Sequence, residues 1–496
     1  MICNYIAYIV AAILLGLCIG RGECAIGVNW GRNNAQRLIP SMVVDLLLQN
    51  GVKEARIYNA QEDILKAFTG SGIDLTITLF NFHAIDSEDE AEKWLSQKLE
   101  YAKHSNIRRI YIGFDAFAQG ITDKKSLNNS LRAYNFMRAA LNDSGYDYVK
   151  ATMPHPDIIL NVENITRPSE ADFRPEIKEE MHGFLRLLEA DKAPLVIELL
   201  PIYYVLLKNL SIDFAGPSEN PSHVIKDVNG AIYTDYFTFL HDSFVWAINK
   251  AGVPDLDIVV GAVGWPTDGF PGGNTSTAEH FFKHLLPYVI SNKGTPMRPG
   301  KPIDTYVHAL TDENMNGDYF PYARHWGIYR TNGEPKYKID LSGQGRDIFP
   351  ARAKGIMRMP ERWCVYKENM KGYNKSRVIE EFKYACKRAD CTSLAPGASC
   401  SGLSFTLNVS YAFNMYFQMM FQDERECVFG GYATVVTEDP STDECVFPVE
   451  VVKGQQENFI FKSGQDRLFA PFSVSLLSVF LGIVKLLESC NNLVRN

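Results

Sequence analysis

The chain has 496 residues, of which 50 are Lys or Arg and 58 are Asp or Glu, so its formal net charge is −8. This acidic balance excludes the basic surface that a nucleic-acid partner requires, and we expect no nucleic acid to bind. The length exceeds that of one ordinary hydrophobic core, so a large domain and a smaller one are expected.

The N-terminus carries an apolar run, Ile6–Ile19. The small residues Gly22 and Cys24 precede a cleavage point before Ala25, so we interpret residues 1–24 as a secretory signal peptide. The run is short for a membrane span. An uncleaved anchor helix is the alternative, and the absence of Lys or Arg before the run is untypical of a signal peptide.

Residues 25–341 alternate short apolar runs with amphipathic stretches, which predicts parallel βα units. The expected strands are Ile26–Trp30, Ala55–Tyr58, Leu75–Phe80, Arg109–Phe114, Tyr148–Met153, Leu195–Pro201, Asp257–Val263 and Thr305–Leu310. The expected helices include Met42–Gln49, Glu88–Lys103, Leu127–Leu141, Glu176–Glu189 and Tyr236–Ala251. This α/β pattern suits a (β/α)8 TIM barrel, in which the working residues lie at the carboxyl ends of the strands.

A linker at 342–360, rich in Gly, Pro and basic residues, leads to a small cysteine-rich module at 361–448. Its cysteines are Cys364, Cys386, Cys391, Cys400, Cys427 and Cys445. An even number of cysteines in a secreted chain indicates disulfides, and their spacing leaves the pairing open. Metal-ligand spacing and a phosphate-binding Gly-rich loop are both missing from the sequence, so we expect no metal and no cofactor.

The C-terminus combines a spacer, 449–467, with an apolar segment, 468–496. We interpret the apolar segment as a signal for a glycosylphosphatidylinositol anchor, with Ser463 and Gly464 at the attachment point. The short spacer and the polar residues that follow the apolar run weaken this interpretation. A single spanning helix is the alternative, and either one would attach the secreted protein to the plasma membrane.

Asn-x-Ser/Thr sequons in a secreted chain are candidate sites for glycans. They begin at Asn128, Asn142, Asn164, Asn209, Asn274, Asn374 and Asn408.

Several motifs of the large domain occur in an order that chance would not produce. They are Ile26–Gly31 (IGVNWG), Gly264–Gly269 (GWPTDG), His325–Ile328 (HWGI) and Pro335–Tyr337 (PKY). With them the sequence resembles plant glycoside hydrolase family 17, the endo-1,3-β-glucanases, and in particular a membrane-anchored subgroup. The resemblance implies a (β/α)8 barrel and a β-1,3-glucan ligand.

The module is similar to carbohydrate-binding module family 43, found behind many plant glucanases. The matching segments are Trp363–Val365, Ala389–Cys391, Ser410–Gln418, Phe429–Gly431 and Asp439–Ser441, together with the six cysteines. This resemblance implies glucan binding. Tyr411, Phe413 and Tyr416, with Phe417, are the candidates for stacking on sugar rings, and packing in the module core is the alternative for each.

The two positions that carry catalysis in family 17 both differ in this chain. The family nucleophile is a Glu two residues before the Gly-Trp-Pro motif, where this sequence has Ala262. The family acid is a Glu at the end of the fourth strand, and here Asp115 takes that place and Phe114 replaces an Asn. Alanine cannot attack a sugar carbon, and the shorter Asp would misplace the acid, so we expect weak hydrolysis or none.

Three other carboxylates are candidates for a relocated catalytic role: Glu198 in place of a family Asn, Asp268 after the Gly-Trp-Pro turn, and Glu313 after the eighth strand. An ordinary ion-paired or surface carboxylate is the alternative for each. The candidates for substrate contacts are Asn29, Trp30, Glu198, Tyr203, Trp265 and Glu313, with core packing as the alternative for the aromatic residues.

The sequence therefore predicts a secreted, membrane-attached β-1,3-glucan binder of the plant cell surface or cell wall, with impaired catalysis. An active glucan hydrolase that uses relocated carboxylates is the first alternative. A structural protein of the cell wall whose barrel no longer binds glucan is the second.

Overall fold

The computed structural model of the chain describes residues 26–316, 323–368 and 374–451. The predicted signal peptide 1–24 and the apolar segment 468–496, with nearly all of the spacer, lie outside these residues. Within the described residues, no helix combines the length and the hydropathy that crossing a membrane would take.

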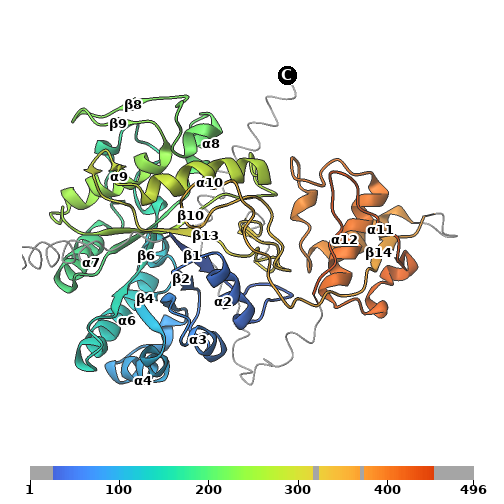
Figure 1. Cartoon of the computed structure of the whole chain (residues 1–496), viewed down its shortest axis with the longest axis horizontal. Coiled ribbons are helices and arrows are strands. Elements are labelled where there is room, and N and C mark those ends of the chain that lie inside the picture. Colours follow the sequence, from blue (N-terminus) through green and yellow to red (C-terminus); the bar gives the residue numbers. More distant parts are fainter. Residues whose placement is uncertain (1–25, 317–322, 369–373, 452–496) are drawn as a thin grey trace, which may run out of the picture.

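The large domain is built around one parallel sheet with the strand order β5-β4-β3-β2-β1-β13-β10-β7-β6. Its strands are β1 (Ile26–Trp30), β2 (Glu54–Ile57), β3 (Asp74–Leu79), β4 (Asn106–Ile112), β5 (Lys150–Thr152), β6 (Pro154–Pro156), β7 (Leu195–Leu199), β10 (Ile258–Gly264) and β13 (Thr305–His308). Only Met153 separates β5, which pairs with β4, from β6, which pairs with β7. The two halves act as one strand, and the sheet closes there into the expected TIM barrel (Figure 1).

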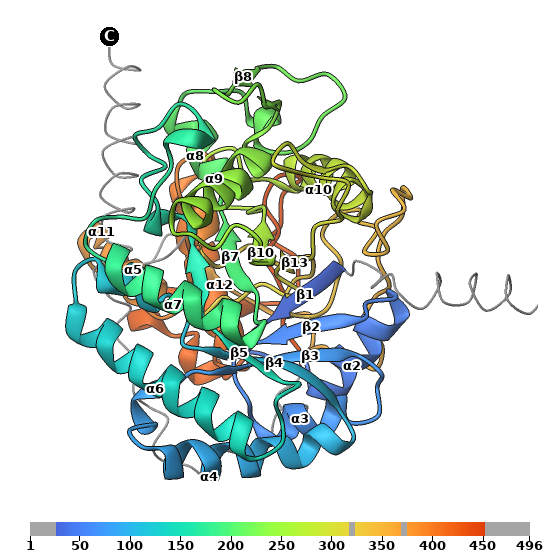
Figure 2. The same ribbon diagram turned by 90° about the vertical axis from the view of Figure 1, so that its left-hand side faces the viewer.

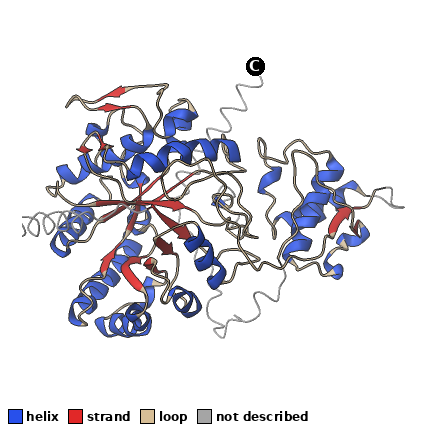
Figure 3. Ribbon diagram, viewed as in Figure 1, coloured by secondary structure: helices blue, strands red, loops and turns tan. Residues whose placement is uncertain are grey.

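The strands are buried on both faces, which explains why they are continuous apolar runs in the sequence. All five residues of β1 are buried, for example. The inner side chains fill the barrel, and the outer ones pack under the helices that surround the strands (Figure 3).

Five barrel helices lie at expected positions: α2 (Pro40–Gln49), α4 (Glu88–Leu99), α6 (Lys124–Asp143), α7 (Lys178–Asp191) and α9 (Tyr236–Lys250). The structure adds α3 (Glu62–Phe68), α5 (Ala116–Gly120), α8 (Pro201–Leu207) and α10 (Thr275–Ile290). Polar caps fix where some of them begin: the Asp123 carboxylate accepts backbone N–H groups of the first turn of α6, and Asp235 does so for α9. Two small hairpins, β8–β9 (Ile225–Lys226, Ile232–Tyr233) and β11–β12 (Gly294–Thr295, Arg298–Pro299), decorate the barrel.

The C-terminal module packs two helices against a short two-stranded sheet. Its elements are β14 (Trp363–Tyr366), α11 (Lys375–Cys386), α12 (Phe405–Met419) and β15 (Ala433–Val436). β14 and β15 are antiparallel, and α12 lies against β14. In Figure 2 the module lies behind the barrel, at one end of it.

Three disulfides hold the module together, and they resolve the pairing that the spacing left open. Cys364 pairs with Cys427, Cys386 with Cys391, and Cys400 with Cys445. The first links β14 to the loop before β15, and the second closes the end of α11. A module this small has little apolar core, so cross-links supply much of its stability.

Candidate functional site

The candidate site lies at the carboxyl ends of the barrel strands, where side chains from distant parts of the sequence converge. Ala262 lies in β10 and is the register partner of Glu198 in β7. Register partners on parallel strands direct their side chains to the same face of the sheet. The structure therefore places a carboxylate directly beside the position where family 17 has its nucleophile.

A bulge in β10 creates this arrangement. The register with β7 shifts between Val260 and Ala262, which leaves Gly261 as the extra residue. A Cβ atom on Gly261 would lie 2.4 Å from Cγ1 of Val196, so only glycine fits here. The carbonyl of Gly261 accepts hydrogen bonds from Asn29 Nδ2 at 2.9 Å and from Arg56 Nη1 at 3.3 Å.

Glu198 is held by an ion pair with Arg56 of β2. Arg56 Nη1 lies 2.5 Å from Glu198 Oε1, and the side chains are 1% and 25% exposed. The guanidinium also faces the rings of Tyr58 at 5.0 Å and Tyr111 at 4.7 Å. Burial lowers the pKa of Arg56, but the Glu198 carboxylate outweighs it and raises that pKa above its usual value. Glu198 is thus committed to neutralising a buried cation.

Asp115 follows β4 and immediately precedes α5. The residue is buried, with 8% of its surface exposed. Gln119 Nε2 donates a hydrogen bond of 2.6 Å to Asp115 Oδ1. Ser126 Oγ in turn donates to Gln119 Oε1 at 3.0 Å and fixes the amide. Burial raises the pKa of Asp115 to about 6, with Gln119 opposing the rise and Glu198 adding to it. The carboxyl group is therefore protonated below about pH 6.

An aromatic strip made of Tyr58, Phe114 and Phe80 crosses the ends of β2, β4 and β3. The ring centroids of Tyr58 and Phe114 are 5.6 Å apart, and those of Phe114 and Phe80 are 5.2 Å apart. Phe80 is 44% exposed, so this large apolar ring is available to a ligand. Flat rings of this kind stack on the apolar faces of sugars.

This strip was not predicted as a binding surface, since Phe114 drew attention only as the replacement of an Asn. The signal was present: three aromatic residues stand at or just after the ends of neighbouring predicted strands. Tyr58 Oη lies 2.8 Å from His308 Nδ1, and burial, together with Arg56, lowers the pKa of His308 to about 4.

Glu313 lies on the loop after β13 and borders the same region. Its Oε1 accepts the backbone N–H of Asn33 at 2.9 Å, and a Cβ atom on Gly31 would lie only 2.1 Å from that oxygen. Burial raises the pKa of Glu313 to about 7, while the Asn33 N–H and the charge of Arg37 oppose the rise. It is a second carboxyl group that is partly protonated near neutral pH.

The other predicted barrel contacts belong to the core. Trp30, Trp265 and Tyr203 are 3%, 1% and 4% exposed, which leaves no ring face for a sugar. Trp265 packs against Phe281 with a centroid distance of 4.8 Å. Asn29 is also fully buried, and it supports the bulge rather than a ligand. Their burial favours core packing, the alternative for these aromatic residues, over sugar stacking.

The predicted binding residues of the module are buried as well. Tyr411, Phe413 and Tyr416 are 4%, 0% and 4% exposed, and Phe417 is 0% exposed. Phe413 stacks on Phe429 with a centroid distance of 3.8 Å, inside the module. A helix with this many apolar residues has to bury most of them in so small a domain. The burial of these four residues thus favours packing in the module core over sugar stacking.

A cavity of about 680 Å³ opens at the opposite, amino-terminal end of the barrel. Its lining is almost balanced in charge, with Glu54, Arg109, Lys150 and Asp304 among its residues. TIM barrels place their sites at the other end, so we assign it no role in glucan binding. Among the described residues, no cluster of three or more His, Cys, Asp or Glu side chains is arranged to hold a metal.

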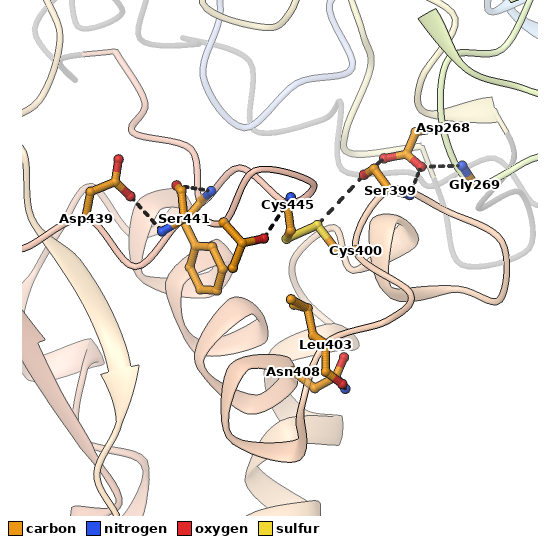
Figure 4. Close-up of a disulfide and its surroundings, with 11 residues drawn as sticks. Asp268, Gly269, Ser399, Cys400, Leu403, Asn408, Asp439, Ser441 and Cys445 are labelled. Atoms are coloured by element: carbon orange, nitrogen blue, oxygen red, sulfur yellow. Dashed lines mark hydrogen bonds between the residues drawn. A yellow bond between two sulfur atoms is a disulfide. The ribbon is translucent and has the colours of Figure 1, made fainter.

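Six of the seven predicted sequon asparagines are exposed: Asn128, Asn142, Asn164, Asn209, Asn274 and Asn374. Asn408 is the exception, because it is half-buried and its Nδ2 donates to the carbonyl of Leu403 at 2.9 Å (Figure 4).

Both parts of the chain match known families. Residues 26–341 match the glycosyl hydrolases family 17, and residues 362–434 match the X8 domain. Among the relatives, glucan endo-1,3-beta-glucosidase 8 of Arabidopsis thaliana is 33% identical over 464 residues, covering 92% of this chain and 95% of the relative. Glucan endo-1,3-beta-glucosidase 5 of the same plant is 34% identical over 436 residues, covering 86% and 88%.

Solved structures resemble the barrel. A beta-1,3-glucanase and allergen of Cryptomeria japonica pollen is 26% identical with a TM-score of 0.60, over 64% of this chain and 99% of that one. One of two plant beta-glucan endohydrolases with distinct substrate specificities is 25% identical with a TM-score of 0.57, over 64% and 100%.

Proposed function

The chain belongs to glycosyl hydrolase family 17 and carries an X8 domain, and we propose that it binds β-1,3-glucan with little or no hydrolysis. The observation that carries this proposal is the environment of Ala262. A methyl group stands at the nucleophile position, and the adjacent carboxylate, Glu198, is tied to the buried Arg56 at 2.5 Å.

Retaining glycosidases need two carboxyl groups about 5–5.5 Å apart, one to protonate the leaving oxygen and one to attack the sugar. Asp115 retains the character of an acid, since its pKa is raised to about 6. The attacking partner is missing, because Ala262 has no nucleophilic atom and an ion-paired Glu198 must give up its buried cation to react. A protonated Asp115 can still hydrogen-bond a bound sugar, but without an attacking carboxylate the covalent glycosyl-enzyme cannot form.

The aromatic strip supports binding itself. The exposed ring of Phe80 and the half-buried rings of Phe114 and Tyr58 offer an apolar surface at the mouth of the barrel. His308 lies beside this surface, within 2.8 Å of Tyr58, and can hydrogen-bond sugar hydroxyls. The carboxyl groups of Asp115 and Glu313, at the same end of the barrel, can do the same. The relatives are named for a neutral polysaccharide, 1,3-β-glucan. Its sugar rings have apolar faces that can stack on aromatic rings and hydroxyl groups at their edges that can hydrogen-bond polar side chains.

We also place the protein outside the cell, attached to the plasma membrane or the wall. The three disulfides favour an oxidising compartment. The signal peptide and the C-terminal anchor remain predictions from the sequence.

An active hydrolase that uses relocated carboxylates is the second candidate. The raised pKa values of Asp115, about 6, and Glu313, about 7, favour it, because general acids need a proton near the working pH. In this case the Asp115→Asn variant would abolish sugar release, whereas the binding proposal expects no release to abolish.

Calorimetric titration with laminarihexaose, followed by chromatography of the recovered sugar, tests the proposal. We expect saturable binding and intact hexasaccharide. A Phe80→Ala/Phe114→Ala variant should bind about thirtyfold more weakly, since each ring stacks with an energy of about 1 kcal/mol and the two together contribute about 2 kcal/mol. The matched control is Tyr148→Ala, an exposed aromatic at the opposite end of the barrel. Absence of binding, or shorter sugars in the recovered material, would overturn the proposal.

A further inference from the structure

Buried polar contacts join the module to the barrel. The side chain of Asp390, in the module, is 3% exposed and lies 3.2 Å from Arg324 Nη1 and 3.1 Å from His325 Nε2, both of the barrel. His325 Nδ1 lies 3.6 Å from Asp312, which is itself paired with Lys336 at 2.6 Å. A chain of five alternating charges thus runs from the barrel into the module. Such buried pairs hold their members in place, because separating them is costly.

A second contact joins the loop after β10 to the module. Asp268 Oδ1 accepts the backbone N–H of Ser399 at 2.9 Å, and Asp268 Oδ2 accepts the Ser399 hydroxyl at 2.6 Å (Figure 4). The disulfide of Cys400 holds the loop that presents Ser399. Gly269, with a φ of +67°, approaches so closely that a Cβ atom would lie 2.1 Å from Cγ2 of Thr392. Asp268, a candidate for catalysis on sequence grounds, therefore serves the interface.

Arg324, which Asp390 holds, also fixes the segment that carries Glu313. The carbonyl of Arg324 accepts the backbone N–H of Glu313 at 3.1 Å, and its Nε donates to the carbonyl of Asn316 at 2.8 Å. The N–H of Asn316 donates in turn to the carbonyl of Glu313 at 3.1 Å, which closes residues 313–316 into a turn. One arginine therefore links the carboxylate of the module to the backbone of a candidate site residue.

The loop after β1 is the other neighbour of Glu313, and the module holds this loop too. The N–H of Asn33 donates to Glu313 Oε1 at 2.9 Å, and the carbonyl of Asn33 accepts the N–H of Met315 at 2.9 Å. Three residues further along, the buried Gln36 donates from Nε2 to the carbonyl of Gln418 in α12 at 2.8 Å. The module thus contacts both segments whose hydrogen bonds set the position of the Glu313 carboxyl group.

This support matters because Glu313 belongs to the candidate site. The residue is half-buried, so part of it remains open to a ligand at the carboxyl end of the barrel. A group that hydrogen-bonds a sugar hydroxyl has to be held at the right distance and angle. A site that is ordered before binding also avoids the entropic cost of ordering its loops on the ligand.

We propose that Asp390 of the module is a positioning residue for the barrel: through Arg324 it holds Glu313 where that residue contacts a bound sugar. Asp390 itself does not touch the sugar, and the proposal requires no sugar contact from the module. It rests on the proposed glucan binding of the barrel and assigns the module a part in completing that site.

Calorimetric titration with laminarihexaose tests the proposal in four full-length proteins: the unaltered protein, Asp390→Asn, Glu313→Gln and the variant with both changes. We expect Asp390→Asn to lower the affinity about tenfold when Glu313 is present, because the Glu313 loop then has to be ordered on binding. When residue 313 is Gln, the same change should cost less than twofold, since a residue that acts through another loses its effect with that partner. Equal losses in both backgrounds, or no loss in either, would overturn the proposal.

Ser399→Ala is the matched control within the same interface. It removes a hydrogen bond that leads to Asp268 rather than to Arg324. We expect it to change the affinity for laminarihexaose less than twofold. A loss as large as that of Asp390→Asn would show that any weakening of the interface has this effect, and it would overturn the role assigned to Asp390.

Hydrogen–deuterium exchange followed by mass spectrometry tests the positioning without any sugar. In Asp390→Asn, peptides within residues 29–37 and 310–316 should exchange faster, because the N–H groups of Asn33 and Glu313 lose protection when their segments loosen. Peptides of α6, on the outside of the barrel, should exchange as in the unaltered protein. Unchanged exchange in both segments would overturn the proposal, and so would faster exchange throughout the chain.

Gln36→Ala provides a second variant that removes no charge, in case Asp390→Asn does not fold. It breaks the contact with Gln418, so residues 29–37 should again exchange faster, and unchanged exchange would count against the hold that the module has on Glu313. If the unaltered protein binds no sugar but the exchange results are as expected, the glucan ligand is refuted while the hold on Glu313 stands.

Discussion

At the scale of single residues, the candidate site has Ala262 where the family resemblance expects a nucleophilic Glu, and Glu198 lies beside it. The loss of the nucleophile at Ala262 was visible in the sequence, because a short motif fixes its position. Its consequence was not visible, since Arg56 and Glu198 are 142 residues apart and meet only through the pairing of the barrel strands. Glu198 supplies the anion that the buried Arg56 requires.

Replacement of Glu198 by Gln should destabilise the fold, because it leaves a buried guanidinium without its anion. We expect a loss of roughly 3 kcal/mol or less in the free energy of unfolding, since Glu198 is partly exposed and water can reach the pair. Urea unfolding measures it. The control Glu180→Gln breaks the exposed pair with Lys124 and should cost under about 1 kcal/mol. Equal costs for both variants would contradict the account of Glu198.

Asp115 should make stability fall as the pH rises. Its folded pKa is raised from 3.8 to about 6, so the folded state keeps a proton that the unfolded state has lost between these values. The destabilisation therefore develops from about pH 4 and is complete above pH 6. An Asp115→Asn variant should gain stability over the unaltered protein at pH 7 but not at pH 4, as urea unfolding at both values will show. A gain that does not depend on pH would contradict the burial of this carboxyl group.

At the scale of elements, the loops at the carboxyl ends of the strands divide into two groups. Those after β2, β3 and β4 carry the aromatic strip, and those after β10 and β13 hold the module. The apolar runs and helical periodicity of the sequence predicted the strands and helices well, because burial on both faces imposes the pattern. The pattern could not separate aromatic side chains that point into a core, such as Trp265 and Phe413, from those like Phe80 that face solvent.

The module interface should weaken at alkaline pH. Burial lowers the pKa of His325, but Asp390 and Asp312 outweigh it and raise that pKa to about 10, and Arg324 and Lys336 pair with the same carboxylates. The stability that His325 contributes is complete below the unfolded pKa of 6.5 and is lost as the pH rises to about 10. The unfolding temperature of the unaltered protein should exceed that of His325→Gln by more at pH 6 than at pH 9. A constant difference would contradict a charged His325 in the interface.

At the scale of the whole molecule, the barrel and the module are joined by contacts between charged and polar side chains, among them Arg324 and His325 with Asp390, and Asp268 with Ser399. The cysteine spacing and the barrel periodicity predicted the two parts of the chain. Their docking was beyond prediction: Asp268, His325 and Asp390 all lie in motifs visible in the sequence, but nothing in those motifs shows that the three residues meet at one interface. The same is true of the aromatic strip, which is assembled from three separate strands.

The most direct measurement is the release of reducing sugar from laminarin by the unaltered protein, by Ala262→Glu/Asp115→Glu, and by the same variant with Glu198→Asn added. Among the described residues, Arg56 pairs with one carboxylate, that of Glu198. Ala262→Glu would place a second carboxylate beside it, and the repulsion between the two would raise the pKa of one of them. We predict no release by the unaltered protein, slight release by the double variant and clear release by the triple variant. Release by the unaltered protein at the rate of the triple variant would contradict the loss of catalysis.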